Sequence, residues 1–213
     1  MLEITPIYLS KFIGNCYLIK TEQGFVLIDT GRGARKKLDH ALHQAGCHPG
    51  NLKLVIITHG DFDHTGNCVY VRDQYRAPIA MHTADAVMVE TGNMFAGSRK
   101  ANPIVAWLVN HLFSIQKFTP DLMIDDHFDL APYGLDARII AIPGHSLGSI
   151  GILTNEEDLF CGDLLTNWKN PELSSIMDDL PTARQSLAKL QKMDIKNVYP
   201  GHGQPFPFSE LNR

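Results

Sequence analysis

Long apolar runs are missing from this sequence, and none approaches the roughly 20 residues that a membrane-crossing helix needs. The first residues, Met1 to Pro6, lack the basic and apolar regions of a secretory signal. Basic residues form no stripe and the formal net charge is −4, which argues against a nucleic-acid partner. We therefore expect a cytoplasmic protein that contacts neither nucleic acid nor a membrane and acts on a small molecule.

Cysteine is scarce: the four residues are widely spaced and form no C-x-x-C pair. Such a pattern favours reduced thiols in a cytosolic protein over a disulfide framework. No internal repeat, low-complexity tract or Gly/Ser linker interrupts the 213 residues, a length that fits one domain with a sizeable core. We therefore predict a single domain over 1–213, as a monomer or a homodimer.

The most informative stretch present is T-H-G-D-F-D-H at 58–64. It directly follows an apolar run that is typical of a buried parallel strand. Alternate residues of an extended segment share a side, so we expect His59, Asp61 and Asp63 to converge, with His64 turning back toward them from the start of a helix. Imidazoles and carboxylates together suit Zn, Fe or Mn better than Ca or Mg.

Three further apolar runs end at residues of ligand type, and they are followed by His145, Asp163 and His202. In α/β architectures, functional groups collect beyond the carboxyl ends of strands. A single strand end followed by a ligand-type residue would be weak evidence for a metal site. Four of them predict a metal site rather than a solvated polar loop.

The order of these motifs resembles that of the metallo-β-lactamase superfamily of hydrolases: H-x-[H/D]-x-D-H at 59–64, P-G-H-S-x-G-S at 143–149, G-D at 162–163 and P-G-H-G at 200–203. The D-T-G at 29–31 matches another motif of that family. The resemblance implies an α/β fold, a four-layer αβ/βα sandwich of two mixed β-sheets flanked by helices, with a metal site at one edge. In this chain we expect a mostly helical insertion at about 84–118.

The resemblance also implies two divalent transition metals, with Zn the usual ion of the family. Carried onto this chain, the metal ligands would be His59, Asp61 and His145 at site one, Asp63, His64 and His202 at site two, and Asp163 as the bridge. Asp63 would also orient the metal-bound water, and Asp29 would orient a ligand histidine through its other ring nitrogen. The ions would lower the pKa of that water toward about 7 and polarise a carbonyl or phosphoryl oxygen.

Position 61 departs from the family pattern, which commonly has His there. Two divalent ions carry four positive charges, and three aspartates and one hydroxide cancel all four, whereas His at 61 would leave one positive charge. Asp61 therefore favours harder ions and makes Fe or Mn an option beside Zn. A related flavo-diiron branch of the superfamily carries Glu at this position, which also favours iron. The alternative is that Asp61 does not reach a metal and the protein holds one ion.

We predict a binuclear metallohydrolase that uses a metal-bound hydroxide on a small ester, thioester or lactone. The alternative on the same fold is an iron-dependent redox enzyme, a dioxygenase or an oxygen-handling protein. A metal-binding module without turnover is a third hypothesis, and the complete set of ligand types argues against it.

Candidate pocket residues are Phe62, His82, Met94 and Phe95, and the loops around Phe62, at 94–99 and at 167–173 are expected to set specificity. Apolar stripes within 93–118 indicate a helix that is core, a lid over the site or a dimer surface.

Overall fold

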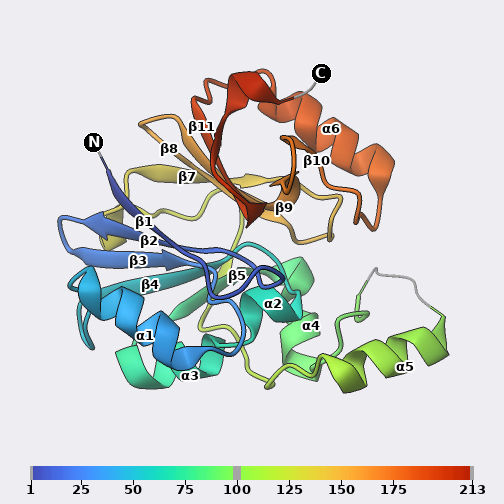
Figure 1. The fold of residues 1–213 in the computed structure, drawn as a ribbon, viewed down its shortest axis with the longest axis horizontal. Helices are drawn as coiled ribbons and strands as arrows, with labels where there is room; N and C mark the ends of the chain where they lie inside the picture. The colour runs from blue at the N-terminus through green and yellow to red at the C-terminus, as the bar shows by residue number, and fades with distance from the viewer. Residues whose placement is uncertain (1, 98–101, 212–213) are drawn as a thin grey trace.

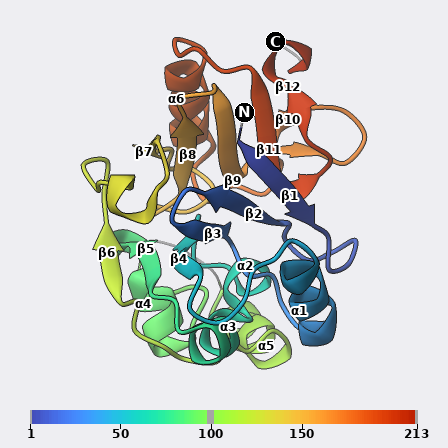
Figure 2. The ribbon, with the colours of Figure 1, turned by 90° about the vertical axis from the view of Figure 1, so that its left-hand side faces the viewer.

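The computed structural model describes residues 2–97 and 102–211. Its strands form two mixed sheets that face each other (Figures 1 and 2). The first sheet has the order β1-β2-β3-β4-β5-β6, with β1 at Glu3–Ile7, β2 at Cys16–Thr21, β3 at Gly24–Ile28, β4 at Leu52–Ile57, β5 at Ile79–His82 and β6 at Leu122–Ile124. The second has the order β12-β11-β9-β8-β7, with β7 at Ala137–Ala141, β8 at Ile150–Thr154, β9 at Asp158–Asn167, β11 at Asn197–Gly203 and β12 at Phe206–Pro207. A short strand, β10 (Glu172–Leu173), pairs with β9 outside this order.

The parallel part of the first sheet brings distant polar segments to one edge. Strands β3, β4, β5 and β6 run parallel, so their carboxyl ends share that edge. The sequence L-K-L-V-I-I of β4 is almost continuously apolar and nearly all of it is buried, as expected for a strand that is covered on both faces. Asp29 follows β3 and His59 follows β4, so the sheet places these two segments side by side.

Helices cover the outer face of each sheet. On the first sheet, Leu38 and Leu42 of α1 (Arg35–Gln44) lie one turn apart and pack into one core with Val71 of α3 (Cys68–Tyr75). On the second sheet, Ala183 and Leu190 of α6 (Leu180–Leu190) pack against the strands.

A third cluster fills the space between the sheets, joining Ile28 and Ile56 of the first to Ile152 and Phe160 of the second. These clusters separate four layers, helix, sheet, sheet and helix, and confirm the predicted sandwich.

Helix α5 (Pro103–Leu112) projects from the body of the molecule at the lower right of Figure 1. None of its residues is buried, and Trp107 is 65% exposed. The core alternative for the apolar stripes is therefore wrong for this helix. The helix ends at Leu112, and Ile115, within the predicted 93–118 segment, is buried separately against Met88 and Met94. Residues 98–101 of the predicted insertion lie outside the described residues.

The remaining elements are short: α2 (Phe62–Thr65), α4 (Thr83–Thr91) and the 3-10 helices η1 (Ala131–Tyr133) and η2 (Phe208–Glu210). Within 2–97 and 102–211, no helix is both long and apolar enough to cross a membrane. All four cysteines are buried and free, as their spacing predicts.

Candidate metal centre

Seven His and Asp side chains converge where the two sheets meet. Their donor atoms form three groups, each within 4.8 Å: His59, Asp61 and His145; Asp63, His64 and His202; and His59, His64 and Asp163. The third group takes one histidine from each of the other two and adds Asp163. Asp163 therefore lies where a bridging carboxylate would have to lie.

The first two groups arise from a change of backbone conformation after Asp61. Asp61 is extended and caps the short helix α2, which contains Asp63 and His64. The expectation that His59, Asp61 and Asp63 share one side of an extended segment was wrong, because the chain becomes helical at Phe62. The helical turn sends Asp61 to His145, with 3.1 Å between Oδ2 and Nε2, and Asp63 to His202 at the same distance.

Asp163 and His202 come from inside strands, not from beyond strand ends as predicted. Asp163 lies within β9 and His202 within β11, where the pairing of these parallel strands shifts register around Pro200. Gly162 adopts φ +49°, in the left-handed region. At Gly201 an added Cβ would collide with the Asp163 carboxylate. The two glycines therefore permit the irregular pairing of β9 and β11 that directs Asp163 and His202 into the donor cluster.

Asp29 contacts one ligand histidine directly, as proposed from the sequence, and reaches a second through Thr58. Its Oδ2 lies 2.8 Å from Nδ1 of His64, and its carboxylate accepts hydrogen bonds from both the backbone N–H and the hydroxyl of Thr58. Because the Thr58 hydroxyl proton is committed to Asp29, its oxygen accepts from Nδ1 of His59 at 3.0 Å. In both imidazoles Nδ1 therefore faces an oxygen outside the cluster, and Nε2 points into the cluster, as a metal ligand requires.

Carboxylate oxygens face these Nε2 atoms: Oδ1 of Asp163 lies 3.2 Å from Nε2 of His64, and Oδ2 of Asp61 lies 3.9 Å from Nε2 of His59. Nε2 of His59 and Nε2 of His64 are buried without a hydrogen bond, and so is Oδ1 of Asp163. In His145 the other ring nitrogen, Nδ1, donates to the carbonyl of Ile176 at 2.8 Å. Buried polar atoms without partners are costly and rare in folded proteins. Converging imidazole nitrogens and carboxylate oxygens therefore fit a transition metal.

The electrostatics of the metal-free cluster reflect its crowding. Burial, reinforced by the neighbouring charges of His64 and His145, holds the pKa of His59 well below its usual value. Burial also lowers the pKa of His145 and of His202, but Asp61 beside the first and Asp163 beside the second overcome it and raise each pKa to about 9. These two imidazoles hold protons that a metal would have to displace.

Asp85 of α4 is a functional residue that the sequence reasoning missed. It is buried; its Oδ1 accepts from Gly148 N–H at 2.8 Å, and its Oδ2 accepts from Gly60 N–H at 2.9 Å and the Ser146 hydroxyl at 2.6 Å. Gly60 lies between His59 and Asp61, and Ser146 follows His145. One carboxylate thus fastens the ligand loop of the first sheet to that of the second. The sequence contains only an indirect indication of this contact, the glycine at position 148 of the S-x-G-S motif. The structure explains that glycine, because an added Cβ there would lie 2.7 Å from the Asp85 carboxylate.

A pocket of about 510 Å³ opens over the cluster, and five of the seven donor residues line it: Asp61, Asp63, His145, Asp163 and His202. Phe62, Met94 and Phe95 line it, as predicted, and so does Trp168 from the 167–173 loop. His82 does not: its Nδ1 accepts from Ala84 N–H at 3.2 Å and caps α4. The strand end that predicted His82 at the pocket continues directly into a helix, and the ring serves that helix. Residues 98 and 99 of the predicted 94–99 loop lie outside the described residues.

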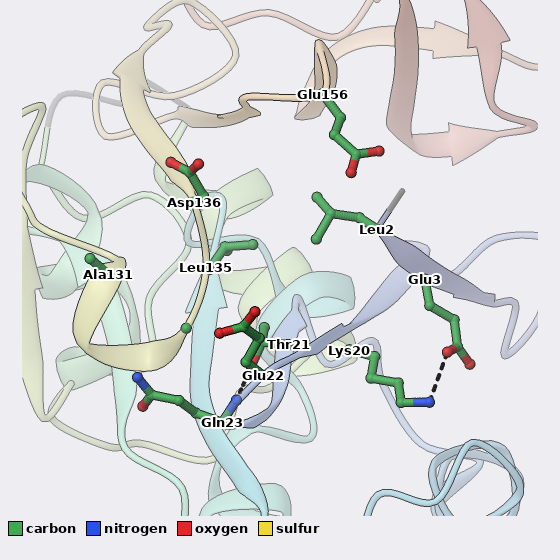
Figure 3. A pocket seen from close by; sticks show the side chains of 11 residues that line it. Leu2, Glu3, Lys20, Thr21, Glu22, Gln23, Ala131, Leu135, Asp136 and Glu156 are labelled. Carbon is green, nitrogen blue, oxygen red and sulfur yellow. Dashed lines mark hydrogen bonds and ion pairs between the residues drawn. The ribbon is translucent and has the colours of Figure 1, made fainter.

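Figure 3 shows a different pocket, of about 660 Å³, between the β2–β3 hairpin and the segment around η1. Lys20 there is paired with Glu3 at 2.9 Å. Its lining includes no histidine, cysteine or metal-ligand candidate among the described residues. Size alone therefore does not mark the functional site in this protein, whereas the donor chemistry does.

Comparison with known proteins decides the family. The model of the metallo-beta-lactamase superfamily matches residues 9–202. This chain belongs to the metallo-β-lactamase superfamily. It is 25% identical to the beta-lactamase-like protein 2 homolog of Caenorhabditis elegans over 89% of the chain, and 27% identical to the atrochrysone carboxyl ACP thioesterase of Aspergillus fumigatus over 89%. The chain spans only 55% and 50%, respectively, of these two proteins.

A solved structure supports the fold of this superfamily member. The crystal structure of TTHA1623 in a di-iron-bound form aligns with a TM-score of 0.76, covering 96% of this chain and 95% of that one at 24% sequence identity. At this identity the likeness establishes the αβ/βα sandwich and does not transfer the metal.

Proposed function

We propose that this protein is a binuclear metallohydrolase of a small ester, thioester or lactone. One observation carries the proposal: seven donors converge beneath an open pocket, and the Nε2 atoms of His59 and His64 are buried among them without a hydrogen bond. Membership of a superfamily made up mostly of hydrolases supports the reaction type. A relative named as a thioesterase supports the inclusion of thioesters.

In this proposal each cluster of donors would hold one ion. His59, Asp61 and His145 would hold the first, Asp63, His64 and His202 the second, and Asp163 would contact both. When bound, the ions would lower the pKa of a water molecule and polarise the substrate carbonyl. A carboxylate oxygen of Asp63 accepts a hydrogen bond from the attacking water and orients it. The water oxygen would bond to the acyl carbon and the acyl C–O or C–S bond would break; one proton of the water would pass to the leaving oxygen or sulfur to give an alcohol or thiol, and the other would remain with the acid.

The charge of the ligands bears on which metal the cluster would prefer. Zinc is the usual ion of this superfamily, but three carboxylates, Asp61 among them, provide a harder donor set that suits Fe or Mn. The same observation favours a second candidate function, an iron-dependent redox enzyme that consumes oxygen.

Metal analysis and a substrate panel test the two candidates together. Purified protein loaded separately with Zn, Fe or Mn should hold about two ions per chain and hydrolyse members of an ester, thioester and lactone panel, and chelation should abolish the activity. A metal content of zero after loading contradicts the proposal, and a content near one indicates a single site. Oxygen consumption by the iron form without any hydrolysis favours the second candidate.

We also propose that the chain acts on a small molecule, without nucleic-acid or membrane contact, in the cytoplasm, and as a monomer or homodimer. Helix α5 would then serve as a lid or a dimer surface, since its apolar side chains are exposed. Light scattering of the protein and of a Trp107→Glu variant separates these roles: a dimer surface loses its dimer, whereas a lid leaves the mass unchanged.

A further inference from the structure

The four histidines of the donor cluster differ in how the ring nitrogen that faces away from the cluster is held. In His59, His64 and His145, Nδ1 faces an oxygen at 2.8–3.0 Å. In His202, Nε2 faces Asp63 at 3.1 Å, whereas Nδ1 is buried without a hydrogen-bond partner among the described residues. A hydrogen bond at the second ring nitrogen normally fixes the orientation of a ligand histidine. The His202 ring must therefore be oriented by another kind of contact.

The indole of Trp168 provides such a contact. It stacks on the His202 ring with 5.3 Å between centroids and 19° between planes. In the described part of the chain, the other ring that contacts His202 is that of His64, at 5.5 Å and 80°, and it belongs to the donor cluster itself. Stacked rings attract each other beyond the effect of the area they bury. The indole face therefore opposes rotation of the imidazole.

The pairing of two strands places Trp168 beside His202. Thr166 and Asn167, the last two residues of β9, pair in parallel with His202 and Gly203 of β11, and the Thr166 hydroxyl donates to the His202 carbonyl at 3.3 Å. Gly203 adopts φ +91°, and an added Cβ there would collide with the carbonyl of Asn167. This close pairing fixes the backbone next to Trp168, so the stack is built into the fold.

We infer that Trp168 is a positioning residue that holds the imidazole of His202 by stacking, where the other ligand histidines are held at Nδ1. The inference rests on the proposed metallohydrolase function, because the ion that His202 would hold belongs to that proposal, and it names how that ion is retained. A change at Trp168 affects the second ion and leaves the first, since His59 and His145 have their own Nδ1 contacts. Because Trp168 also lines the pocket, one side chain serves both the pocket wall and the metal ligand.

Zinc affinities of ring variants test this role without turnover. Trp168→Leu keeps an apolar side chain but removes the ring, and it should raise one of the two zinc dissociation constants about tenfold while leaving the other unchanged. Trp168→Phe keeps a ring and should stay within about threefold of the parent. The matched control is Trp107→Leu, because Trp107 stacks on His111 at 5.5 Å and 8° outside the donor set, and it should change neither constant.

Competition for zinc against a chelator measures both constants. A Trp168→Leu protein that binds both ions as the parent does overturns the inference, and so does a loss of affinity that Trp107→Leu reproduces.

A double variant shows whether Trp168 acts through His202. If it does, adding Trp168→Leu to His202→Ala should weaken zinc binding no further, because the imidazole that the indole positions is already gone. Losses of affinity that add up in the double variant overturn the positioning role.

Nuclear magnetic resonance of the metal-free protein tests the same role if no zinc binds. The ring protons of His202 should show nuclear Overhauser contacts to the His64 ring in the parent and in Trp168→Phe, and these contacts should weaken in Trp168→Leu as the imidazole turns. A Trp168→Leu protein that keeps them overturns the inference. If the zinc constants follow the expected pattern but no ester, thioester or lactone is hydrolysed, the hydrolase proposal fails and the role of Trp168 stands.

Discussion

Oδ2 of Asp61 lies 3.1 Å from Nε2 of His145, so a carboxylate occupies the site-one position where His is common in the superfamily. This contact brings Asp61 into the donor cluster, as a ligand role requires. Because a carboxylate donates more charge to a metal than an imidazole does, it should raise the pKa of the water that the metal activates.

Asp61→His should therefore lower the midpoint of the alkaline rise in the pH–rate profile by about one pH unit and shift the preferred ion from Fe or Mn toward Zn. Competition between metals followed by elemental analysis measures the preference. Metal occupancy must be measured beside each rate, because imidazole reaches farther than a carboxylate. Asp178→Asn is the control, since it removes a pocket carboxylate outside the donor set. A variant with two ions and the parent's pH profile and metal preference shows that Asp61 does not tune the water.

Asp163→Ala should remove both ions, because Asp163 is the carboxylate grouped with histidines of both clusters. We expect the metal content to fall from about two ions toward zero and kcat/KM to fall by about a thousandfold or more, since several kcal/mol of transition-state stabilisation depend on the ions. His202→Ala should weaken only the second site and leave about one tightly held ion. Elemental analysis after dialysis distinguishes the two patterns. Retention of two ions and full activity by Asp163→Ala rules out the bridging role.

The sandwich itself was predictable, because its signals are local. The apolar run of β4, the paired leucines of α1 and the ordered motifs each act over a few residues, and the family resemblance joined them. The course of 59–64 was not predictable from alternation, because the chain changes from extended at Asp61 to helical at Phe62. Asp163 and His202 were assigned to strand ends, since a bulged parallel ladder continues through the motif glycines without changing their pattern.

The role of Asp85 could not be predicted from local sequence patterns. Its partners Gly60, Ser146 and Gly148 are 25, 61 and 63 residues away, and nothing around Asp85 itself marks a buried carboxylate. The exposure of α5 was equally hidden. Its apolar stripes have the periodicity of a buried helix, but in the part of the chain that the structure describes none of its residues is buried and only Val109 packs partly against the cluster of Met88, Met94 and Ile115.

Metal binding should release protons and strengthen as the pH rises. The pKa values of His145 and His202 in the metal-free fold are about 9, above the roughly 6.5 of an unfolded histidine. Their protonated forms stabilise the metal-free protein fully below about pH 6.5, and this contribution is lost as the pH rises toward 9. Because the ligands must lose these protons, loading near pH 7.5 should release at least about two protons per chain.

Calorimetric titration of the metal-free protein with zinc, in two buffers of different ionisation enthalpy, counts those protons. The increase in Tm on metal loading should also be larger near pH 8.5 than near pH 6.5, because the metal-free protein has by then lost the stabilising protons. An enthalpy that does not depend on the buffer contradicts the protonated cluster.

Asp85→Asn should loosen both ligand loops at once. In either orientation the amide group turns an N–H toward a donor, whether Gly148 N–H on one side or Gly60 N–H and the Ser146 hydroxyl on the other, so at least one buried hydrogen bond is lost. A buried hydrogen bond to a charged group contributes about 1.5–3 kcal/mol, which corresponds to a decrease in Tm of about 3–12 °C for a protein of this size. Because Gly60 adjoins His59 and Asp61, and Ser146 adjoins His145, we also expect metal affinity to fall about tenfold to a hundredfold.

Thermal melting of the metal-free protein and competition for zinc against a chelator measure the two effects of Asp85→Asn separately. Asp73→Asn makes the same chemical change at an exposed helix position and should shift neither. Ser146→Ala removes one of the three donors and should fall between the control and Asp85→Asn. If Asp85→Asn lowers Tm and leaves zinc affinity intact, Asp85 stabilises the fold without positioning the ligands; if neither changes, the carboxylate does not join the two loops.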